Sequence, residues 1–318
     1  MARISTYLLQ GFLLWWLPII LVPISVSGQG SLEIVSHTKK GGISYGISVN
    51  EKYAFVTNNK GVYVFEIINP RNPILVSKIN TGVTFGIDIH NDQAFIIGEG
   101  QLKIVDISEP VNPIIRKELD FIEYSQSLIV EDSYLYIANE RGLDILDISD
   151  LEQIRNISHY GDIWYRSTAI KEGIAYIASY NNGVEVVDVS NPNTPKRITM
   201  VSGTEGAVSL HVHNDFLFVA RSNQGISILD ISIKESPKVI SNFCDNDDGE
   251  AKDVWGNNDY LFIQDGWGVE VLDISDPSNP YEICENKKCG GHEIFSDGNY
   301  VYVATGKKGM IVLLLKII

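Results

Sequence analysis

Residues 142–149 have the sequence GLDILDIS, and this phrase of eight residues returns along the whole chain. Six further copies, some of them divergent, begin at Gly61, Gln101, Gly183, Gly225, Gly268 and Gly309. The starts of the seven copies are separated by 40, 41, 41, 42, 43 and 41 residues. A period of this length indicates repeated structural units that stack against one another.

Each phrase is the third of four short segments rich in valine, isoleucine and aromatic residues. In the third repeat the second segment is YLYIA from Tyr134, and a more variable first segment lies before it. The fourth segment follows a proline-containing turn, as in NPIIRKEL from Asn112. Such segments, bounded by Gly, Asn, Asp or Pro, are predicted to be β-strands. The sequence therefore predicts an all-β fold, a seven-bladed β-propeller of four-stranded blades.

The two ends of the repeat array complement each other. The seventh copy ends at Ile318, directly after its third segment, and so lacks a fourth strand. The sequence SLEIVSHTKK from Ser31 is similar to the fourth-strand phrase NPILVSKINT. We expect residues 31–38 to complete the last blade and close the ring, which removes two exposed sheet edges. The predicted propeller domain spans residues 31–318.

The phrase LKIVDIS with its following prolines resembles the LVIVD repeat, a family of propeller repeats found in exported and surface proteins. The best-matching residues are Asp106, Asp147, Asp188, Asp230 and Asp273, with Pro110, Pro113, Pro192, Pro195, Pro277 and Pro280. The first repeat departs from the pattern with Glu66 and the last with Leu314. The resemblance implies the architecture and no single activity. Because the aspartates recur in most blades, we expect them to accept backbone N–H groups of the proline turn.

Charge and the N-terminal segment restrict the partners and the location. The 318 residues have a formal net charge of −15 without a Lys/Arg cluster, which argues against nucleic acid as a partner. Residues 1–27 contain Arg3, an apolar run and the small residues Ser25 and Ser27. This pattern predicts a secretory signal peptide or, if uncleaved, an N-terminal membrane anchor. Both interpretations place the propeller outside the cell, secreted or at the cell surface, with membrane contact only through an uncleaved segment.

In the aligned inner strands, one column follows the rule that residues beside the axis are small, except in two blades. It contains the small residues Gly46, Gly86, Ser127, Ser167 and Ser209 in five blades, but Asp253 and Glu293 in the last two. The neighbouring column contains Tyr45, Phe85, Gln126, Arg166, Val208, Lys252 and His292. We expect both columns to meet at one mouth of the central channel, and a rule broken in this way indicates a functional site.

Loops predicted on the same face contain several aromatic residues. With the charged column they form a predicted ligand-binding face of Tyr45, Tyr124, Trp164, Tyr165, Arg166, Tyr180, Lys252, Trp267 and His292. Aromatic rings beside charged groups suit the recognition of proteins or glycans. Packing of these rings between blades is the alternative interpretation.

The cysteines and an acidic loop offer candidate cross-links and metal sites. Cys284 and Cys289 are the candidate disulfide pair, and pairing of Cys244 with Cys289 is the alternative. Cys284, Cys289 and His292 could also supply three zinc ligands, although a fourth ligand in register is missing. The candidate calcium ligands are Asp245, Asp247, Asp248 and Glu250, in a loop that departs from the EF-hand spacing. We expect no bound metal or cofactor, and calcium is the alternative.

Two functions remain open at this point. The sequence lacks the Walker and HExxH motifs, so we expect an exported non-catalytic recognition or scaffold propeller that binds a surface protein or glycan. The alternative is a hydrolase or lyase that uses Asp253 and Glu293 as a carboxylate pair beside His292. Two carboxylates at a confined mouth can have different pKa values, as acid and base catalysis requires.

Overall fold

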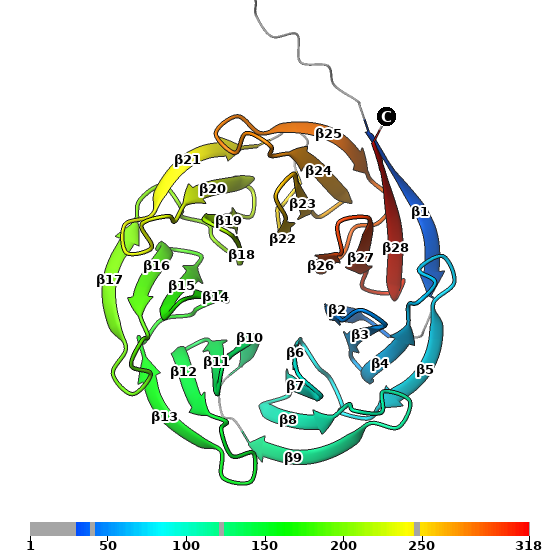
Figure 1. Ribbon diagram of the computed structural model, residues 1–318, viewed down its shortest axis with the longest axis vertical. Helices are drawn as coiled ribbons and strands as arrows, with labels where there is room; N and C mark the ends of the chain where they lie inside the picture. The colour runs from blue at the N-terminus through cyan, green and yellow to red at the C-terminus, as the bar shows by residue number, and fades with distance from the viewer. Residues whose placement is uncertain (1–29, 39–41, 121–123, 245–248, 318) are drawn as a thin grey trace, which may run out of the picture.

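The computed structural model describes residues 30–38, 42–120, 124–244 and 249–317. These residues form 28 β-strands in seven four-stranded antiparallel sheets, arranged as blades around a central axis (Figure 1). The predicted seven-bladed propeller is confirmed. Residues 1–27, the predicted leader or anchor, lie outside the described residues. Within the described ranges, no helix has the length and apolar character needed to cross a membrane.

We number the blades I to VII along the chain. Blade I contains β2 (Ser44–Val49), β3 (Tyr53–Asn58), β4 (Gly61–Glu66) and β5 (Ile74–Ile79). Blade II contains β6 (Gly86–His90), β7 (Gln93–Gly98), β8 (Gln101–Asp106) and β9 (Ile114–Asp120). Blade III contains β10 (Ser125–Glu131), β11 (Tyr134–Asn139), β12 (Gly142–Asp147) and β13 (Arg155–Tyr160). Blade IV contains β14 (Ser167–Lys171), β15 (Ile174–Ser179), β16 (Gly183–Asp188) and β17 (Lys196–Val201).

The remaining blades follow the same order from the axis outward. Blade V contains β18 (Ser209–His213), β19 (Phe216–Ala220), β20 (Ile226–Asp230) and β21 (Lys238–Phe243). Blade VI contains β22 (Asp253–Gly256), β23 (Tyr260–Gln264), β24 (Val269–Asp273) and β25 (Tyr281–Asn286). Blade VII contains β26 (Glu293–Ser296), β27 (Tyr300–Ala304), β28 (Met310–Ile317) and β1 (Gly30–Thr38).

The hydrophobic core lies between the blades. The second and third strands of a blade pack against neighbours on both faces, so β15 is buried at all six positions. The outer strand β9 instead alternates between exposed and half-buried residues, because only one of its faces packs. One core cluster combines Val184 of blade IV with Leu217 of blade V, and the others join adjacent blades in the same way. Each interface between two blades is therefore a local core.

The recurring aspartates stabilise turns, as expected from the sequence. In blade II, Asp106 Oδ1 accepts hydrogen bonds from the Ser108 backbone N–H at 2.9 Å and from its hydroxyl at 2.7 Å. Arg116 Nη2 lies 2.6 Å from the other oxygen of Asp106. Equivalent turn bonds form at Asp147, Asp188, Asp230 and Asp273. These hydrogen bonds, with the nearby Arg116 charge, lower the pKa of Asp106 to about 2.

The N-terminal strand closes the ring. β1 pairs antiparallel with β28, from Gly30 opposite Ile317 to Thr38 opposite Met310. Leu32 of β1 is 6% exposed and belongs to the core cluster between blades VI and VII. The predicted closure by residues 31–38 is thus confirmed. Both ends of the propeller lie in one blade at the rim (Figure 1).

Candidate functional site

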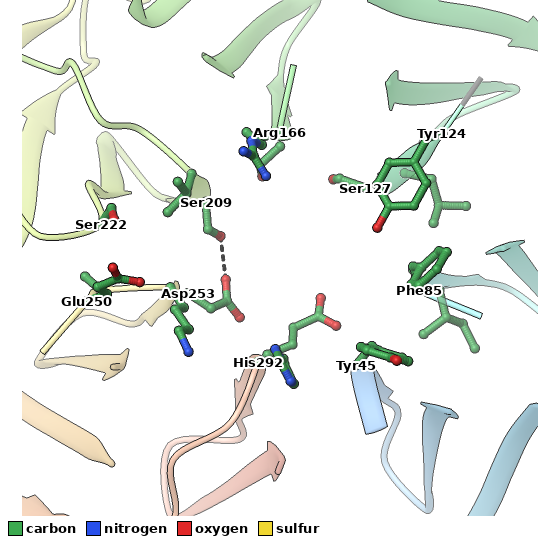
Figure 2. A pocket seen from close by; sticks show the side chains of 18 residues that line it. Tyr45, Phe85, Tyr124, Ser127, Arg166, Ser209, Ser222, Glu250, Asp253 and His292 are labelled. Carbon is green, nitrogen blue, oxygen red and sulfur yellow. Dashed lines mark hydrogen bonds between the residues drawn. The ribbon is translucent and has the colours of Figure 1, made fainter. Parts of the chain in front are cut away.

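A cavity of about 450 Å³ lies on the ring axis, where all seven inner strands begin. We call it the axial pocket (Figure 2). Its wall includes the predicted residues Tyr45, Tyr124, Arg166, Lys252 and His292. The predicted carboxylates Asp253 and Glu293 also line it. Residues separated by up to 248 positions in the chain, from Tyr45 to Glu293, therefore meet at one site.

The backbone pattern explains why the columns converge. Arg166, Lys252 and His292 each donate their backbone N–H to a carbonyl of the adjacent second strand, at 2.8, 2.8 and 2.9 Å. Phe85 and Val208 make the equivalent bond, at 2.9 Å each. In these five blades, the residue just before the inner strand is therefore held at the same height. Side chains of this column then surround the axis at one level.

Aromatic rings form a continuous arc along one side of the pocket. The Tyr45 and Phe85 ring centroids are 5.4 Å apart at an interplanar angle of 64°, and those of Phe85 and Tyr124 are 5.2 Å apart at 59°. The His292 ring extends the series, 5.6 Å from Tyr45. Tilted and edge-on contacts of this kind stabilise the ring orientations. Phe85 was in the aligned column but not in the predicted binding face, and it is the centre of this arc.

Cationic side chains lie on other parts of the pocket wall. The Arg166 guanidinium is centred 3.8 Å from the ring of Trp164, a cation–π contact that orients it. In the described part of the chain, the Lys252 ammonium makes neither a hydrogen bond nor an ion pair. Burial and the Lys252 charge lower the pKa of His292 below 6.5, so this imidazole is neutral at neutral pH. Lysine and arginine therefore supply the positive charge here.

Asp253 joins three blades at the pocket wall. Its Oδ1 accepts a hydrogen bond from the Ser209 hydroxyl of blade V (Figure 2). Its Oδ2 accepts one from the Ile294 backbone N–H of blade VII at 2.8 Å. Burial raises the pKa of Asp253 to about 6 in spite of these bonds. Both oxygens of this carboxylate are thus engaged in contacts between blades.

Glu293 makes the same kind of contact one blade further on. Its Oε2 accepts a hydrogen bond from the Ile47 N–H of blade I at 2.7 Å. Burial and the Asp253 charge raise the pKa of Glu293 well above 4.5. A Cβ at Gly46 would lie 2.6 Å from this oxygen, which explains the small residue at that position.

Asp88 is a third inter-blade carboxylate, which sequence reasoning missed. Its Oδ2 accepts the Val130 N–H of blade III at 2.8 Å, and burial raises its pKa. It lies two residues after Gly86, outside the column that drew attention to Asp253. An acidic residue within an otherwise apolar inner strand was the pattern that could have identified it.

The predicted binding face is corrected at Tyr165. This side chain is only 2% exposed, and its hydroxyl donates to Glu185 Oε2 at 2.6 Å between blades III and IV. It is therefore part of the core, and packing between blades, the alternative interpretation, holds for this residue. Trp164, Tyr180 and Trp267 are exposed but lie outside the wall of the axial pocket. Trp164 contributes indirectly, by holding Arg166.

The cysteine prediction is not realised in the structure. Cys284 and Cys289 have free thiols, so neither the predicted pair nor the alternative pair of Cys244 with Cys289 forms. The Cys289 thiol is buried and donates to the Asn286 carbonyl at 3.0 Å, in the turn after β25. A Cβ at Gly30 would lie 3.5 Å from the Cys284 sulfur, which places that sulfur beside the start of β1 instead. The two sulfurs therefore make different contacts.

Of the four candidate calcium ligands, one lies among the described residues. Asp245, Asp247 and Asp248 lie outside the described residues, whereas Glu250 is exposed and lines the axial pocket. Among the described residues, no three His, Cys, Asp or Glu side chains are grouped as a metal site would require. Cys284, Cys289 and His292 are accordingly not brought together as the alternative zinc site.

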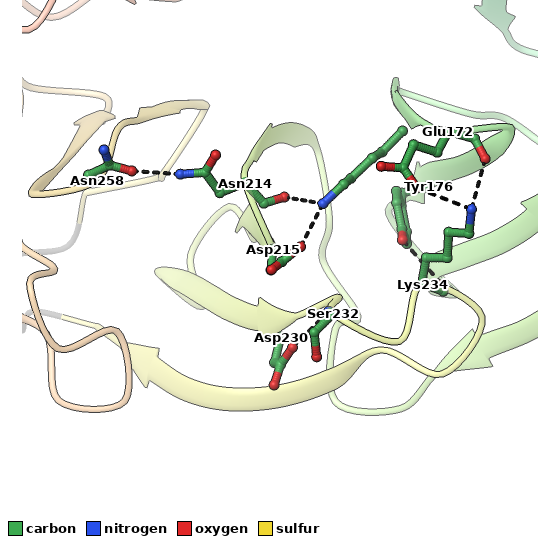
Figure 3. Close-up of polar contacts among 9 residues, drawn as sticks. Glu172, Tyr176, Asn214, Asp215, Asp230, Ser232, Lys234 and Asn258 are labelled. Carbon is green, nitrogen blue, oxygen red and sulfur yellow. Dashed lines mark hydrogen bonds and ion pairs between the residues drawn. The ribbon is translucent and has the colours of Figure 1, made fainter.

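Charged groups at the opposite end of the ring are used to join blades. Lys171 Nζ donates to the Asn214 carbonyl at 2.6 Å and lies 2.8 Å from Asp215 Oδ1 (Figure 3). Asn214 Nδ2 donates to Asn258 Oδ1 at 2.6 Å, which continues the network into blade VI. Lysine is thus paired at this end, in contrast to Lys252 in the axial pocket.

Comparisons with known proteins agree with this architecture. The family model of the LVIVD repeat matches residues 41–81, 82–120, 123–160, 165–201, 206–245, 248–285 and 293–313. The β-propeller domain of Myceliophteria thermophila Cps50 (Swd1) is similar with a TM-score of 0.73 and 9% identity, over 89% of this chain and 98% of that one. The computationally designed Ika8 protein is similar with a TM-score of 0.64 and 9% identity, over 89% of this chain and 99% of that one. A search of curated protein sequences finds no match.

Structural likeness at 9% identity shows a shared fold and nothing about shared function. The propeller fold is compatible with a scaffold or recognition role. The matched repeats cover each of the seven blades, with their aspartates in the turns described above. The chain therefore belongs to the family of LVIVD-repeat proteins.

Proposed function

We propose that this protein is an exported, non-catalytic recognition propeller that binds a protein or a carbohydrate at the cell surface through its axial pocket. The main supporting observation is the composition of that pocket. It combines an arc of aromatic rings with the cations of Arg166 and Lys252, while Asp253 and Glu293 bind backbone amides of neighbouring blades. Aromatic and arginine side chains supply most of the binding energy at many recognition sites.

Rigidity of the scaffold supports the same proposal. The inner strands of blades V, VI, VII and I are joined in series by the hydrogen bonds of Asp253 and Glu293. The contacts between tilted rings and the Trp164–Arg166 contact limit the freedom of the pocket wall further. A preorganised site of this kind loses little conformational entropy when a ligand binds.

Binding by pocket variants tests the proposal. Wild-type protein would be passed over arrays of extracellular proteins and glycans, and positive ligands measured by titration. Arg166→Ala and Phe85→Ala should each weaken binding at least tenfold, about 1.4 kcal/mol. Arg155→Ala is the matched control, because Arg155 lies on the outer strand β13. Unchanged binding by both pocket variants would refute a recognition role for this site.

Export is supported by the sequence of residues 1–27 alone. Expression of the full chain with its own N-terminus, followed by fractionation and intact-mass measurement, tests it. A mature protein that starts after residue 27 in the medium agrees with a cleaved signal peptide. A full-length membrane-bound protein agrees with an anchor, and retention inside the cell would refute export.

The hydrolase or lyase alternative retains one observation in its favour. Asp253 has a pKa of about 6 beside His292 in a pocket, and perturbed carboxylates of this kind occur at catalytic sites. Asp253→Asn and Glu293→Gln preserve the shapes of the side chains and remove the ionisable groups. A non-catalytic protein would bind its ligand equally well with either substitution. Turnover of a ligand by wild type that both substitutions abolish would favour the enzyme.

A further inference from the structure

Two cationic and three acidic side chains line the axial pocket of this acidic molecule. The chain has a net charge of −15, yet Arg166 and Lys252 enter the pocket from blades IV and VI. Lys252 makes no ion pair in the described residues. Glu250 is exposed at the rim, and the deeper carboxylates accept hydrogen bonds from Ser209, Ile294 and Ile47. An anionic group on a ligand would therefore give Lys252 a partner, because a carboxylate accepts strong hydrogen bonds from lysine.

The part of the wall from blades I to III offers a surface for an apolar ring face. Tyr45, Phe85 and Tyr124 come from blades I, II and III and line the pocket side by side (Figure 2). The faces of aromatic rings are electron-rich, so they attract the weakly positive C–H face of a saturated ring. Rigid aromatic surfaces of this kind also lose little side-chain entropy on binding.

Serine hydroxyl groups also line the pocket. Ser127 and Ser167 lie on neighbouring inner strands, and Ser222 lies at the rim on the far side of the pocket. A serine hydroxyl both donates and accepts hydrogen bonds, as the hydroxyls of a sugar do. A volume of about 450 Å³ is in the usual range for small-molecule sites. A ligand that combines an anionic group, an apolar ring face and hydroxyls would match these three features together, and an acidic peptide would match them less well.

We propose that the axial pocket binds an acidic sugar residue of a glycan, with the sugar carboxylate on Arg166 and Lys252 and the ring face against Tyr45, Phe85 and Tyr124. The inference rests on the proposed recognition function and names its ligand class. A densely charged glycan would be repelled by the remaining acidic surface. The ligand is therefore a glycan in which acidic residues are bound singly.

Titration with a matched pair of probes tests the inference. The first probe is an immobilised neutral oligosaccharide that ends in a single galacturonic acid residue, and the second is the same oligosaccharide with that carboxyl group methyl-esterified. Wild type should bind the acid form at least tenfold more tightly than the ester, because only the acid form has the charge. Lys252→Ala should weaken binding of the acid form at least tenfold. The control Lys238→Ala, which removes an exposed lysine from the outer strand β21, should leave it unchanged.

The possible results separate this inference from the proposed function. Equal affinity for acid and ester forms, or no binding of the acid form at millimolar concentration, would overturn the acidic-sugar assignment. An acidic peptide bound more tightly than the oligosaccharide, and weakened by Lys252→Ala, would overturn it too but preserve recognition through the axial pocket. If Lys252→Ala and Arg166→Ala bind every ligand as wild type does, the recognition function fails as well. Circular dichroism of each variant verifies that it is folded.

Discussion

Asparagine in place of Asp253 is expected to flatten the dependence of stability on pH between about 4 and 7. Burial raises the pKa of Asp253 to about 6 in the folded protein, from an ordinary value of 3.8. Between these values the folded state holds a proton that the unfolded state has released. The free energy of unfolding therefore falls as the pH rises through this window.

The size of the effect follows from the difference in pKa. At ~1.4 kcal/mol for each tenfold difference in proton affinity, ionisation of Asp253 costs the folded state ~3 kcal/mol. For a domain of this size that is a decrease of ~6 °C in Tm. Asparagine can accept the Ile294 N–H through its oxygen and donate to the Ser209 hydroxyl through its amide, so the contacts between blades survive. The Tm of the variant should exceed that of wild type by more at pH 7.5 than at pH 4.5.

Thermal unfolding followed by circular dichroism at pH 4.5, 5.5, 6.5 and 7.5 measures this difference. The lower limit avoids the region below about pH 4, where turn aspartates such as Asp106 have lowered pKa values and lose their stabilising contacts on protonation. Asp132→Asn is the control, because Asp132 is exposed and has φ near 54°, a conformation that asparagine also adopts. Parallel curves for wild type and Asp253→Asn would refute the argument that Asp253 is buried with a raised pKa.

Three further substitutions test the fold and the corrected site. Leu32→Ala in β1 should lower the free energy of unfolding by ~2–4 kcal/mol, because it leaves a cavity between blades VI and VII, whereas the neighbouring Glu33→Ala should change Tm little. Equal effects of the two substitutions in urea unfolding would contradict the ring closure. Tyr165→Phe removes one hydrogen-bond donor from buried Glu185, so it should lower the free energy of unfolding by ~1.5–3 kcal/mol in thermal unfolding without changing ligand binding. Weaker ligand binding at an unchanged Tm would return Tyr165 to the binding face. Gly46→Ala should destabilise the folded protein by ~1–3 kcal/mol, because the added Cβ would lie 2.6 Å from Glu293 Oε2. An unchanged Tm would show that this carboxylate does not occupy the space beside β2.

The sequence repeat made the fold predictable, together with the position of the site along the ring axis. A period near 41 residues aligns equivalent positions, and the main-chain register then places Arg166, Lys252 and His292 at one level without further information. The alternation of side chains along a strand sends such a column towards the axis. Ring closure was predictable for the same reason, because an unpaired third strand requires a partner.

Contacts between blades were not predictable from the repeat. Tyr165 is buried in the core between blades III and IV, where its hydroxyl meets Glu185 on the third strand of blade IV, a pairing that local pattern does not reveal. Asp88 meets the Val130 amide in the same manner. Cysteine spacing suggested a disulfide, yet the turn after Asn286 gives the Cys289 thiol a carbonyl partner instead. These contacts depend on geometry between units, whereas the repeat describes the geometry within one unit.

The pairing of β1 with β28 also determines how the molecule would be presented to a partner. Met310 pairs with Ala304, whose carbonyl accepts the His292 N–H at the pocket end of blade VII. From there β28 runs towards the other end of the ring, where Ile317 lies opposite Gly30. A tether joined at residue 30 and a fusion joined at residue 317 would therefore both leave from the side away from the axial pocket. Attachment at either position would orient the pocket outward, towards whatever approaches from solution.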